Sequence, residues 1–233
     1  MIPRSRIILL LTAIAIISTT AMAAESPRSL KISEQVYDFG HVGIAFKLFH
    51  TFRLINNGEQ PIRILGLDVS CHCSMVGLLD SLIEPGDTVP MPLRYDTKDL
   101  FGPTAKSFRV TTDDPDRPEL QFFYKSIVGQ WYDGLKPNPM SLFFLPGQKP
   151  RKVTIPNRSF DEISLSIIEQ SDTTFDITVL KEEARRNQAL ELEVRPKAAL
   201  NPGTYLSGFT IEINTGHDKK PVILTVPVKT VIY

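Results

Sequence analysis

Hydrophobic and polar residues alternate with a period of two in several short segments of the chain. Apolar residues stand at every second position between residues 190 and 194, and Phe209, Ile211 and Ile213 alternate with polar neighbours in the same way. This period places successive side chains on opposite faces of an extended strand, so that one face can be buried while the other meets water. The segments therefore predict half-buried β-strands.

Clusters of turn-forming residues separate the predicted strands. Asn, Asp, Gly and Pro gather at residues 56–58, 84–87, 113–116, 201–203 and 215–218. These residues favour tight turns because they tolerate or preset the backbone angles that turns require. Residues 181–188 have helical character but are polar on all sides, so we expect a long hairpin loop or a single helical turn there. The pattern as a whole predicts an all-β protein.

The order of strands and turns repeats loosely along the chain. Residues 102–128 contain an alternating strand, a turn, a proline and a second apolar strand, and residues 203–228 repeat that order. Upstream, residues 51–56 resemble residues 152–157. Two copies of about 100 residues with some seven strands each have the size of an immunoglobulin-like β-sandwich. We therefore expect two such domains in tandem.

The boundary between the two domains is expected near residues 129–139, where glycine and prolines interrupt regular structure. Trp131, the one tryptophan of the chain, stands at this boundary. Its first interpretation is a side chain that packs one domain against the other. Because exposed tryptophans are enriched at binding hot spots, Trp131 is also a candidate partner contact.

The start of the chain is typical of a secretory signal peptide. Arg4 and Arg6 precede an apolar run, and a small-x-small cleavage site is formed by Ala21, Met22 and Ala23. The apolar run is shorter than the roughly 20 residues that span a bilayer, and no other segment is long and apolar enough. We therefore expect no membrane span in the mature chain.

These observations define three expected segments. Residues 1–23 are predicted to be a cleaved signal peptide, residues 24–130 the first immunoglobulin-like domain and residues 131–233 the second. The predicted location is periplasmic or secreted.

Charge and cysteine content exclude several classes of protein. Lys+Arg and Asp+Glu number 26 each, so no basic surplus points to nucleic acid or to an anionic membrane. Two cysteines in 233 residues are too few for a disulfide scaffold or a four-thiolate zinc fold.

An ordered series of motifs in the first domain resembles a known family. The series consists of Tyr37-Asp38-Phe39-Gly40-His41-Val42, the stretch 50–58, Ser70-Cys71-His72-Cys73-Ser74, the stretch 83–87, Tyr95-Asp96-Thr97-Lys98 and Thr111-Thr112-Asp113-Asp114-Pro115 with Pro118. Residues 31–129 resemble the bacterial exported family called domain of unknown function 1573, which is related to Hydin-type immunoglobulin-like modules. The resemblance implies a seven-stranded sandwich and export, and it implies no catalytic activity. The family has Cys-Gly-Cys where this chain has His72 between the cysteines.

Cys71, His72 and Cys73 are the most compact group of reactive side chains in the sequence. In a strand the two thiols would share one face and His72 the other, whereas a turn would allow all three to converge. Four interpretations stay open: cysteines packed as small apolar residues, a Cys71–Cys73 disulfide that requires a tight turn, a soft-metal site such as Cu(I), and pairing with a thiol of another protein. A strained disulfide would suit a redox or sensing role.

Other polar residues point to structure and binding more than to catalysis. His50 lies within an apolar alternation and is interpreted as a hydrogen-bonded sheet residue. Asp113, Asp114 and Asp116 belong to a turn whose loop is a candidate partner contact, and their spacing is not that of an EF-hand. The sequence contains no Gly-x-Ser-x-Gly, His-Glu-x-x-His or phosphate-binding glycine loop.

The sequence thus predicts a non-catalytic, exported binding or structural module with no cofactor. The expected partner is a protein or a component of the cell envelope, recruited through strand edges and end loops. The alternative is a thiol-redox or copper-binding protein that uses Cys71 and Cys73.

Overall fold

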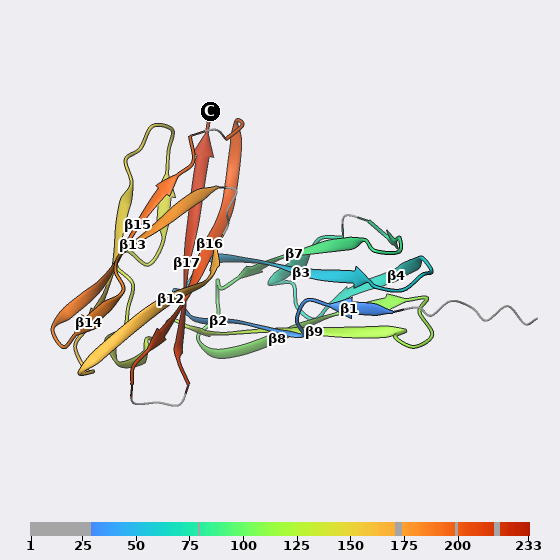
Figure 1. The fold of residues 1–233 in the computed structure, drawn as a ribbon, viewed down its shortest axis with the longest axis horizontal. Coiled ribbons are helices and arrows are strands. Elements are labelled where there is room, and N and C mark those ends of the chain that lie inside the picture. Colours follow the sequence, from blue (N-terminus) through green and yellow to red (C-terminus); the bar gives the residue numbers. More distant parts are fainter. Residues whose placement is uncertain (1–28, 79, 171–173, 199, 217–219) are drawn as a thin grey trace, which may run out of the picture.

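A computed structural model describes residues 29–78, 80–170, 174–198, 200–216 and 220–233 (Figure 1). The predicted signal peptide lies outside these residues. The described residues form seventeen β-strands and one short 3-10 turn, so the chain is all-β as the sequence predicts. No helix among them is long and apolar enough to cross a membrane.

The N-terminal half, residues 29–128, is built from two facing sheets. One has the strand order β1-β3-β7-β5, and the other contains β2-β9-β8-β4-β6. Their bounds are β1 (Leu30–Ile32), β2 (Val36–Val42), β3 (Lys47–Asn56), β4 (Ile62–Val69), β5 (Ser74–Val76), β6 (Leu82–Ile83), β7 (Thr88–Asp96), β8 (Gly102–Thr112) and β9 (Glu119–Val128).

The C-terminal half, residues 131–233, begins with the 3-10 turn η1 (Tyr132–Gly134). One of its sheets has the order β11-β15-β13, and the other contains β14-β12-β16-β17, with β10 paired to β17. Their bounds are β10 (Leu142–Phe144), β11 (Arg151–Asn157), β12 (Glu162–Gln170), β13 (Phe175–Lys181), β14 (Glu183–Arg185), β15 (Gln188–Pro196), β16 (Gly203–Asn214) and β17 (Val222–Ile232).

Each half buries its own hydrophobic cluster between its two sheets. In the N-terminal half, Phe52 of β3 contacts Phe108 and Phe122 of the opposite sheet, with ring centroids 5.2 and 5.3 Å away. In the C-terminal half, Phe175 of β13 meets Phe209 of β16 at 6.1 Å. The first cluster ends in sequence at Val128 and the second begins at Leu135. The change from one cluster to the other thus lies within residues 129–134.

The two halves share local structural features where the sequence repeats. Residues 102–128 and 203–232 both fold into a long antiparallel hairpin, β8–β9 and β16–β17. Asn56, at the end of β3, is fully buried and donates its side-chain N–H to Ile83 O at 2.9 Å. Asn157, at the end of β11, donates to Ala184 O at the same distance. In both halves a buried asparagine at the end of a strand therefore binds a carbonyl 27 residues further along the chain.

Residues 181–188 correct a prediction. They form the end of β13, the short strand β14 and the start of β15, instead of a long loop or a helical turn. Asn187 supplies the positive φ of 65° that the tight turn before β15 needs. The polar character of the segment reflects exposure: Glu183 and Arg185 face water on either side of Ala184, which is buried.

The two halves are joined through β2 and β17, which make one large sheet continuous between them. These strands pair in parallel at one position, His41 with Leu224. In Figure 1 the strands of the two halves run crosswise, with β2 entering the junction beside β17. Gly40 has a positive φ of 63°, and a Cβ atom there would lie 2.0 Å from Ile223 O. A glycine is therefore required where the strands cross.

Candidate functional site

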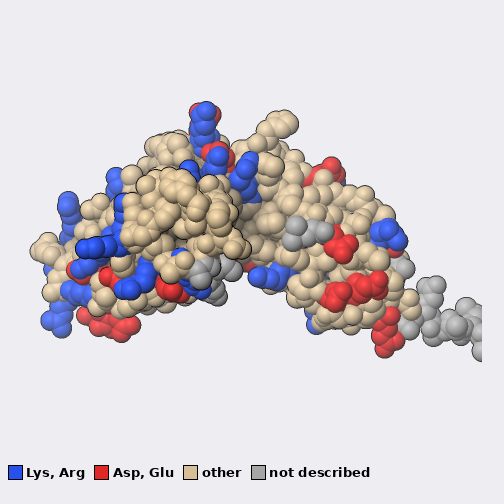
Figure 2. Space-filling view, turned by 90° about the horizontal axis from the view of Figure 1, so that it is seen from above, with Lys and Arg blue, Asp and Glu red and all other residues tan. Residues whose placement is uncertain are grey.

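A cleft of about 850 Å³ lies at the junction and takes its walls from both halves. The N-terminal half contributes β2, β8 and β9, and the C-terminal half contributes η1 and the start of β17. Figure 2 shows the molecule as two rounded masses whose surface is hollowed where they meet. The lining residues are Asp38, Gly40, His41, Pro103, Thr104, Ala105, Lys125, Ser126, Ile127, Tyr132, Lys220, Pro221, Val222 and Ile223. We call this site the junction cleft.

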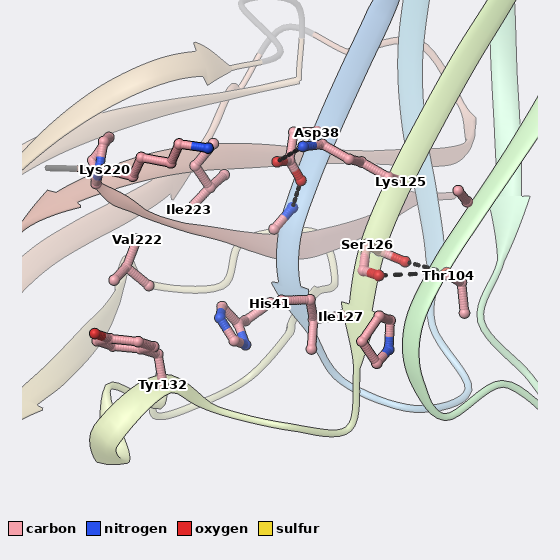
Figure 3. A pocket seen from close by; sticks show the side chains of 14 residues that line it. Asp38, His41, Thr104, Lys125, Ser126, Ile127, Tyr132, Lys220, Val222 and Ile223 are labelled. Atoms are coloured by element: carbon pink, nitrogen blue, oxygen red, sulfur yellow. Dashed lines mark hydrogen bonds and ion pairs between the residues drawn. The ribbon is translucent and has the colours of Figure 1, made fainter. Parts of the chain in front are cut away.

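Two lysines supply positive charge to the junction cleft. Lys125 of β9 binds Asp38 with 2.9 Å between its Nζ and the carboxylate Oδ2, and the other Asp38 oxygen accepts the N–H of Gly40. Lys220 comes from the other half and is exposed. Figure 3 shows Lys125 and Lys220 pointing toward each other with Asp38 between them. The described lining therefore contains one carboxylate, which Lys125 engages, and a second lysine from the other half.

Aromatic and aliphatic side chains form the opposite part of the junction cleft. His41 Nδ1 lies 2.8 Å from Gln130 O, which fixes the orientation of its ring, and the ring of Tyr132 lies 6.3 Å from it. Val222 and Ile127 face the same space from the two halves (Figure 3). The junction cleft thus combines apolar lining with a few polar groups, which is the general composition of ligand-binding pockets.

A second polar cluster, the Glu-His-Glu cluster, crosses the junction beside β3. It consists of Glu34, Tyr37, His50, Glu169 and Thr210. His50 is 8% exposed, and its two ring nitrogens lie 2.8 Å from Glu34 Oε1 and 2.8 Å from Glu169 Oε1. Tyr37 stacks on the imidazole at 3.6 Å and donates its hydroxyl to Glu169. Glu169 and Thr210 belong to the C-terminal half, so the cluster connects the two halves.

The charges in the Glu-His-Glu cluster shift the pKa values of its members. Burial alone would lower the pKa of His50, but the hydrogen bonds and charges of Glu169 and Glu34 outweigh it and raise the pKa above 6.5. Burial likewise opposes ionisation of Glu169, but the hydrogen bond from His50 holds the pKa of that carboxyl below 4.5. Burial and the neighbouring Glu169 raise the pKa of Tyr37. The stable arrangement is an imidazolium between two carboxylates. His50 is thus the hydrogen-bonded sheet residue that the sequence predicts.

The Cys-His-Cys motif forms a turn between β4 and β5. A disulfide joins Cys71 and Cys73, whose Cα atoms are 5.3 Å apart, and His72 is exposed at the tip of the turn. The described residues contain no group of three or more His, Cys, Asp or Glu side chains arranged to hold a metal ion.

The predicted aspartate contacts belong to the turn between β8 and β9. Asp113 Oδ1 accepts the N–H of Arg63 at 2.8 Å, and Asp114, which is 1% exposed, accepts the N–H of Asp116 at 3.0 Å. Asp114 is therefore a structural turn residue in this fold, whereas Asp116 is exposed. Because β8 and β9 are antiparallel, this turn lies at the far end of the hairpin from Val128 and the junction.

Trp131 lies at the junction, where the sequence placed it. Its side chain is partly buried and packs against the hydrophobic cluster of the C-terminal half. It also lines a groove together with Phe46 of the N-terminal half. The structure does not bring Trp131 together with the aspartates of the β8–β9 turn. Both remain predicted contacts.

Sequence reasoning missed the residues that meet at the junction. Lys125 and Lys220 are 95 positions apart, and His50 and Glu169 are 119 positions apart. A local signal existed only for His50, a titratable residue at an inward-facing position of an apolar strand. Nothing near the two lysines or Glu169 in the sequence distinguishes them from ordinary exposed charges.

Comparison with solved structures finds matches at low sequence identity and low TM-score. A PapD-like domain of human CEP192 matches with a TM-score of 0.36 and 12% identity, covering 56% of this chain and all of that one. A protein of unknown function from Porphyromonas gingivalis matches with a TM-score of 0.33 and 12% identity, over 86% of this chain and 99% of that one. The periplasmic chaperone SfaE matches with a TM-score of 0.33 and 9% identity, over 88% and 100%. No curated protein matches the sequence significantly.

Comparison with family models agrees with the motifs of the N-terminal half. The matched region begins at β1 and reaches into β9, and it includes the Cys-His-Cys turn and the strand that carries His50. The predicted resemblance is confirmed: residues 30–124 match the family described as "Protein of unknown function (DUF1573)".

Proposed function

We propose that this chain is an exported, non-catalytic binding module of the bacterial cell envelope that holds an acidic segment of a partner protein in the junction cleft. In this proposal residues 1–23 are removed on export, and residues 24–130 and 131–233 are two immunoglobulin-like β-sandwich domains. The family match of the N-terminal half and the all-β structure with two separate hydrophobic clusters support it.

The observation that carries the proposal is the composition of the junction cleft. Among the described residues, its lining contains two lysines, one from each half, and a single carboxylate, that of Asp38, which is already engaged by Lys125. A partner carboxylate placed near Lys220 would gain a charge-assisted contact, while an adjacent apolar side chain would lie against Val222 and Ile127. The partner would therefore present an acidic residue next to an apolar one.

Charge reversal at Lys220 tests the cleft directly. The mature chain is used to select from a library of displayed peptides, and the enriched peptides are measured by isothermal titration calorimetry. Acidic-apolar peptides are expected to bind the wild-type protein, and Lys220→Glu is expected to weaken them about 10-fold or more, because an attraction becomes a repulsion. Lys31→Glu is the matched control, since Lys31 is an equally exposed lysine on β1, outside the cleft.

The two variants separate the possible results. Equal weakening by both substitutions would show a general charge effect and would contradict the cleft as the site. Peptides without acidic residues, or peptides unaffected by Lys220→Glu, would also contradict it. The oligomeric state, measured on the same samples by light scattering, shows whether the cleft is free in solution.

A further inference from the structure

The Cys71–Cys73 disulfide closes a loop with only one residue inside it. A disulfide stabilises a fold by restricting the unfolded chain, and this stabilisation becomes smaller as the closed loop becomes shorter. A loop this short therefore contributes little. Both cysteines are partly exposed, and His72 between them is exposed. A bond that is accessible and of little structural value is suited to chemical exchange.

The backbone around the turn is held without the disulfide. Ser70 N donates to Ser107 O at 3.0 Å on one side, and Asp96 N donates to Cys73 O at 2.8 Å on the other. Within the turn, Ser74 N donates to Cys71 O at 3.3 Å. Because these bonds do not involve sulfur, we expect them to persist when the disulfide is reduced. The two thiols would then stay adjacent and could re-form the bond.

A buried hydroxyl pair lies beneath the two sulfur atoms. Ser74 is 7% exposed, and its Oγ is 3.6 Å from Cys73 Sγ and 3.9 Å from Cys71 Sγ. Tyr124 donates its own hydroxyl proton to Ser74 Oγ at 2.6 Å. Since Ser74 accepts the proton of Tyr124, its own proton is free to point at a sulfur. A hydrogen bond of this kind stabilises a thiolate.

The two sulfur atoms differ in their surroundings. Cys71 Sγ accepts the backbone N–H of Cys73 at 3.0 Å and is also within reach of Ser74. Cys73 Sγ has Ser74 as its hydrogen-bonding neighbour and packs partly against the hydrophobic cluster. Negative charge is therefore better accommodated on Cys71, which makes it the better leaving group in an exchange.

We propose that the Cys71–Cys73 disulfide oxidises a dithiol of another protein, with Cys73 as the sulfur that is attacked and Cys71 as the sulfur that leaves. A partner thiolate attacks Cys73 Sγ, the Cys71–Cys73 bond breaks, and Cys71 departs as a thiolate that Ser74 and the N–H of Cys73 stabilise. The second partner thiolate then attacks the partner's sulfur in the mixed disulfide and releases Cys73. The partner dithiol loses two electrons and two protons and becomes a disulfide, and both cysteines of this chain end as thiols.

This redox role is independent of the junction cleft. The turn and the cleft share no residue, so Lys220→Glu is expected to leave the exchange unchanged. Failure of the peptide-binding experiment would therefore leave the redox proposal standing, and failure of the redox experiment would leave the cleft standing.

The site of attack is tested on the oxidised full-length mature protein under native conditions. The probe is reduced glutathione, a monothiol that cannot complete the second step, followed by acid quenching, alkylation and peptide mass mapping. We expect glutathione on Cys73 and an alkylated thiol at Cys71. Glutathione predominantly on Cys71 would overturn the assignment of roles, and a bond that resists reduction until urea is added would overturn the proposal as a whole.

The role of the hydroxyl pair is tested by the rate of reduction with dithiothreitol. Ser74→Ala is expected to slow reduction about 10-fold, because the leaving thiolate loses a hydrogen bond. Ser126→Ala is the matched control: Ser126 is also buried and also bonded to a tyrosine, with 3.2 Å between its Oγ and the hydroxyl of Tyr95. If Ser74→Ala does not fold, Tyr124→Phe takes its place in the comparison, because it removes the other hydroxyl of the pair. Equal rates in the Ser74 or Tyr124 variant and the Ser126 variant would contradict the role of the pair.

Discussion

At the scale of single residues, His50 connects the two halves of the molecule. Its protonated ring donates one hydrogen bond to Glu34 of its own half and one to Glu169 of the other half, both at 2.8 Å. A neutral imidazole has only one N–H, so it can satisfy only one of the two carboxylates. Two further titratable groups belong to these surroundings. Tyr37, a neutral phenol, stacks on the imidazole ring, and the charge of Arg53 acts on Glu169. Protonation of His50 thus governs whether Glu34 and Glu169 can both accept a hydrogen bond from the ring.

The free energy of unfolding is expected to depend on pH through His50. Its folded pKa is raised above the unfolded value of 6.5, so its stabilisation is complete below pH 6.5 and is lost as the pH rises through the folded pKa. Each pKa unit by which the folded value of His50 exceeds the unfolded value contributes about 1.4 kcal/mol to the free energy of unfolding. The lowered pKa of Glu169 acts in the opposite direction: its contribution is present above pH 4.5 and is lost as the pH falls. Urea denaturation at a series of pH values measures both the loss of stability at high pH and the loss at low pH.

Replacement of His50 isolates its share of the pH dependence. In His50→Gln the fall in stability above pH 6.5 is expected to disappear, because glutamine does not titrate. His41→Gln, a substitution of the histidine that contacts a backbone carbonyl, is the control and is expected to retain the fall. A wild-type profile that is flat between pH 6 and 9 would contradict the prediction.

At the scale of elements, the crossing of β2 and β17 determines how the halves meet. Thr225 Oγ1 donates to Phe39 O at 2.7 Å, and the parallel pairing involves a single position. The close approach depends on Gly40, which has no side chain to separate the strands. In the sequence Gly40 stood out only as part of the motif from Tyr37 to Val42, because the need for glycine arises from β17, which is some 180 residues away.

A side chain at position 40 is expected to weaken the junction. Gly40→Ala combines a left-handed backbone with a methyl group against Ile223 O, and we expect a loss of about 2–4 kcal/mol in urea denaturation. Gly86→Ala is the matched control, because Gly86 also has a positive φ, of 84°, but has nothing within 4 Å of a new Cβ atom. The free energy of unfolding of the control is expected to fall by only about 1–2 kcal/mol, the cost of placing alanine in a left-handed backbone. Equal losses in the two variants would show that the crossing is not tightly packed.

At the scale of the whole molecule, the described residues form two separate hydrophobic clusters. Each cluster lies between the sheets of its own half, and the connection includes the β2–β17 crossing and the Glu-His-Glu cluster. Such an arrangement is typical of domains that fold separately and are then held in one orientation. In Figure 2 red side chains predominate on the visible face of the N-terminal half, whereas most of the blue ones lie on the C-terminal half.

A fragment of residues 24–130 is expected to fold by itself. It retains all the described strand pairings of the N-terminal half except the β2–β17 position. Its free energy of unfolding is expected to be about 2–4 kcal/mol lower than that of the same half in the full chain, because the hydrogen bonds across the junction are lost. Circular dichroism and urea denaturation of the fragment measure this. A fragment without β-structure or without a cooperative transition would contradict the division into two domains.

The sequence by itself determined the class of structure and the family resemblance of residues 30–124. Alternation with a period of two, punctuated by turn residues, requires half-buried strands wherever a core forms, and the motifs from Tyr37 to Pro118 are local enough to be recognised in order. The sequence could not determine the partners of His50. It also could not determine strand β14, because the register of β14 depends on β12. The tertiary structure decided which residues meet: the lysines of the junction cleft, the two glutamates beside His50 and the hydroxyls beneath Cys71 and Cys73. The physical reason is that hydrogen bonds and charges act over a few ångströms in space, whereas their donors and acceptors are separated by up to 186 positions in the chain.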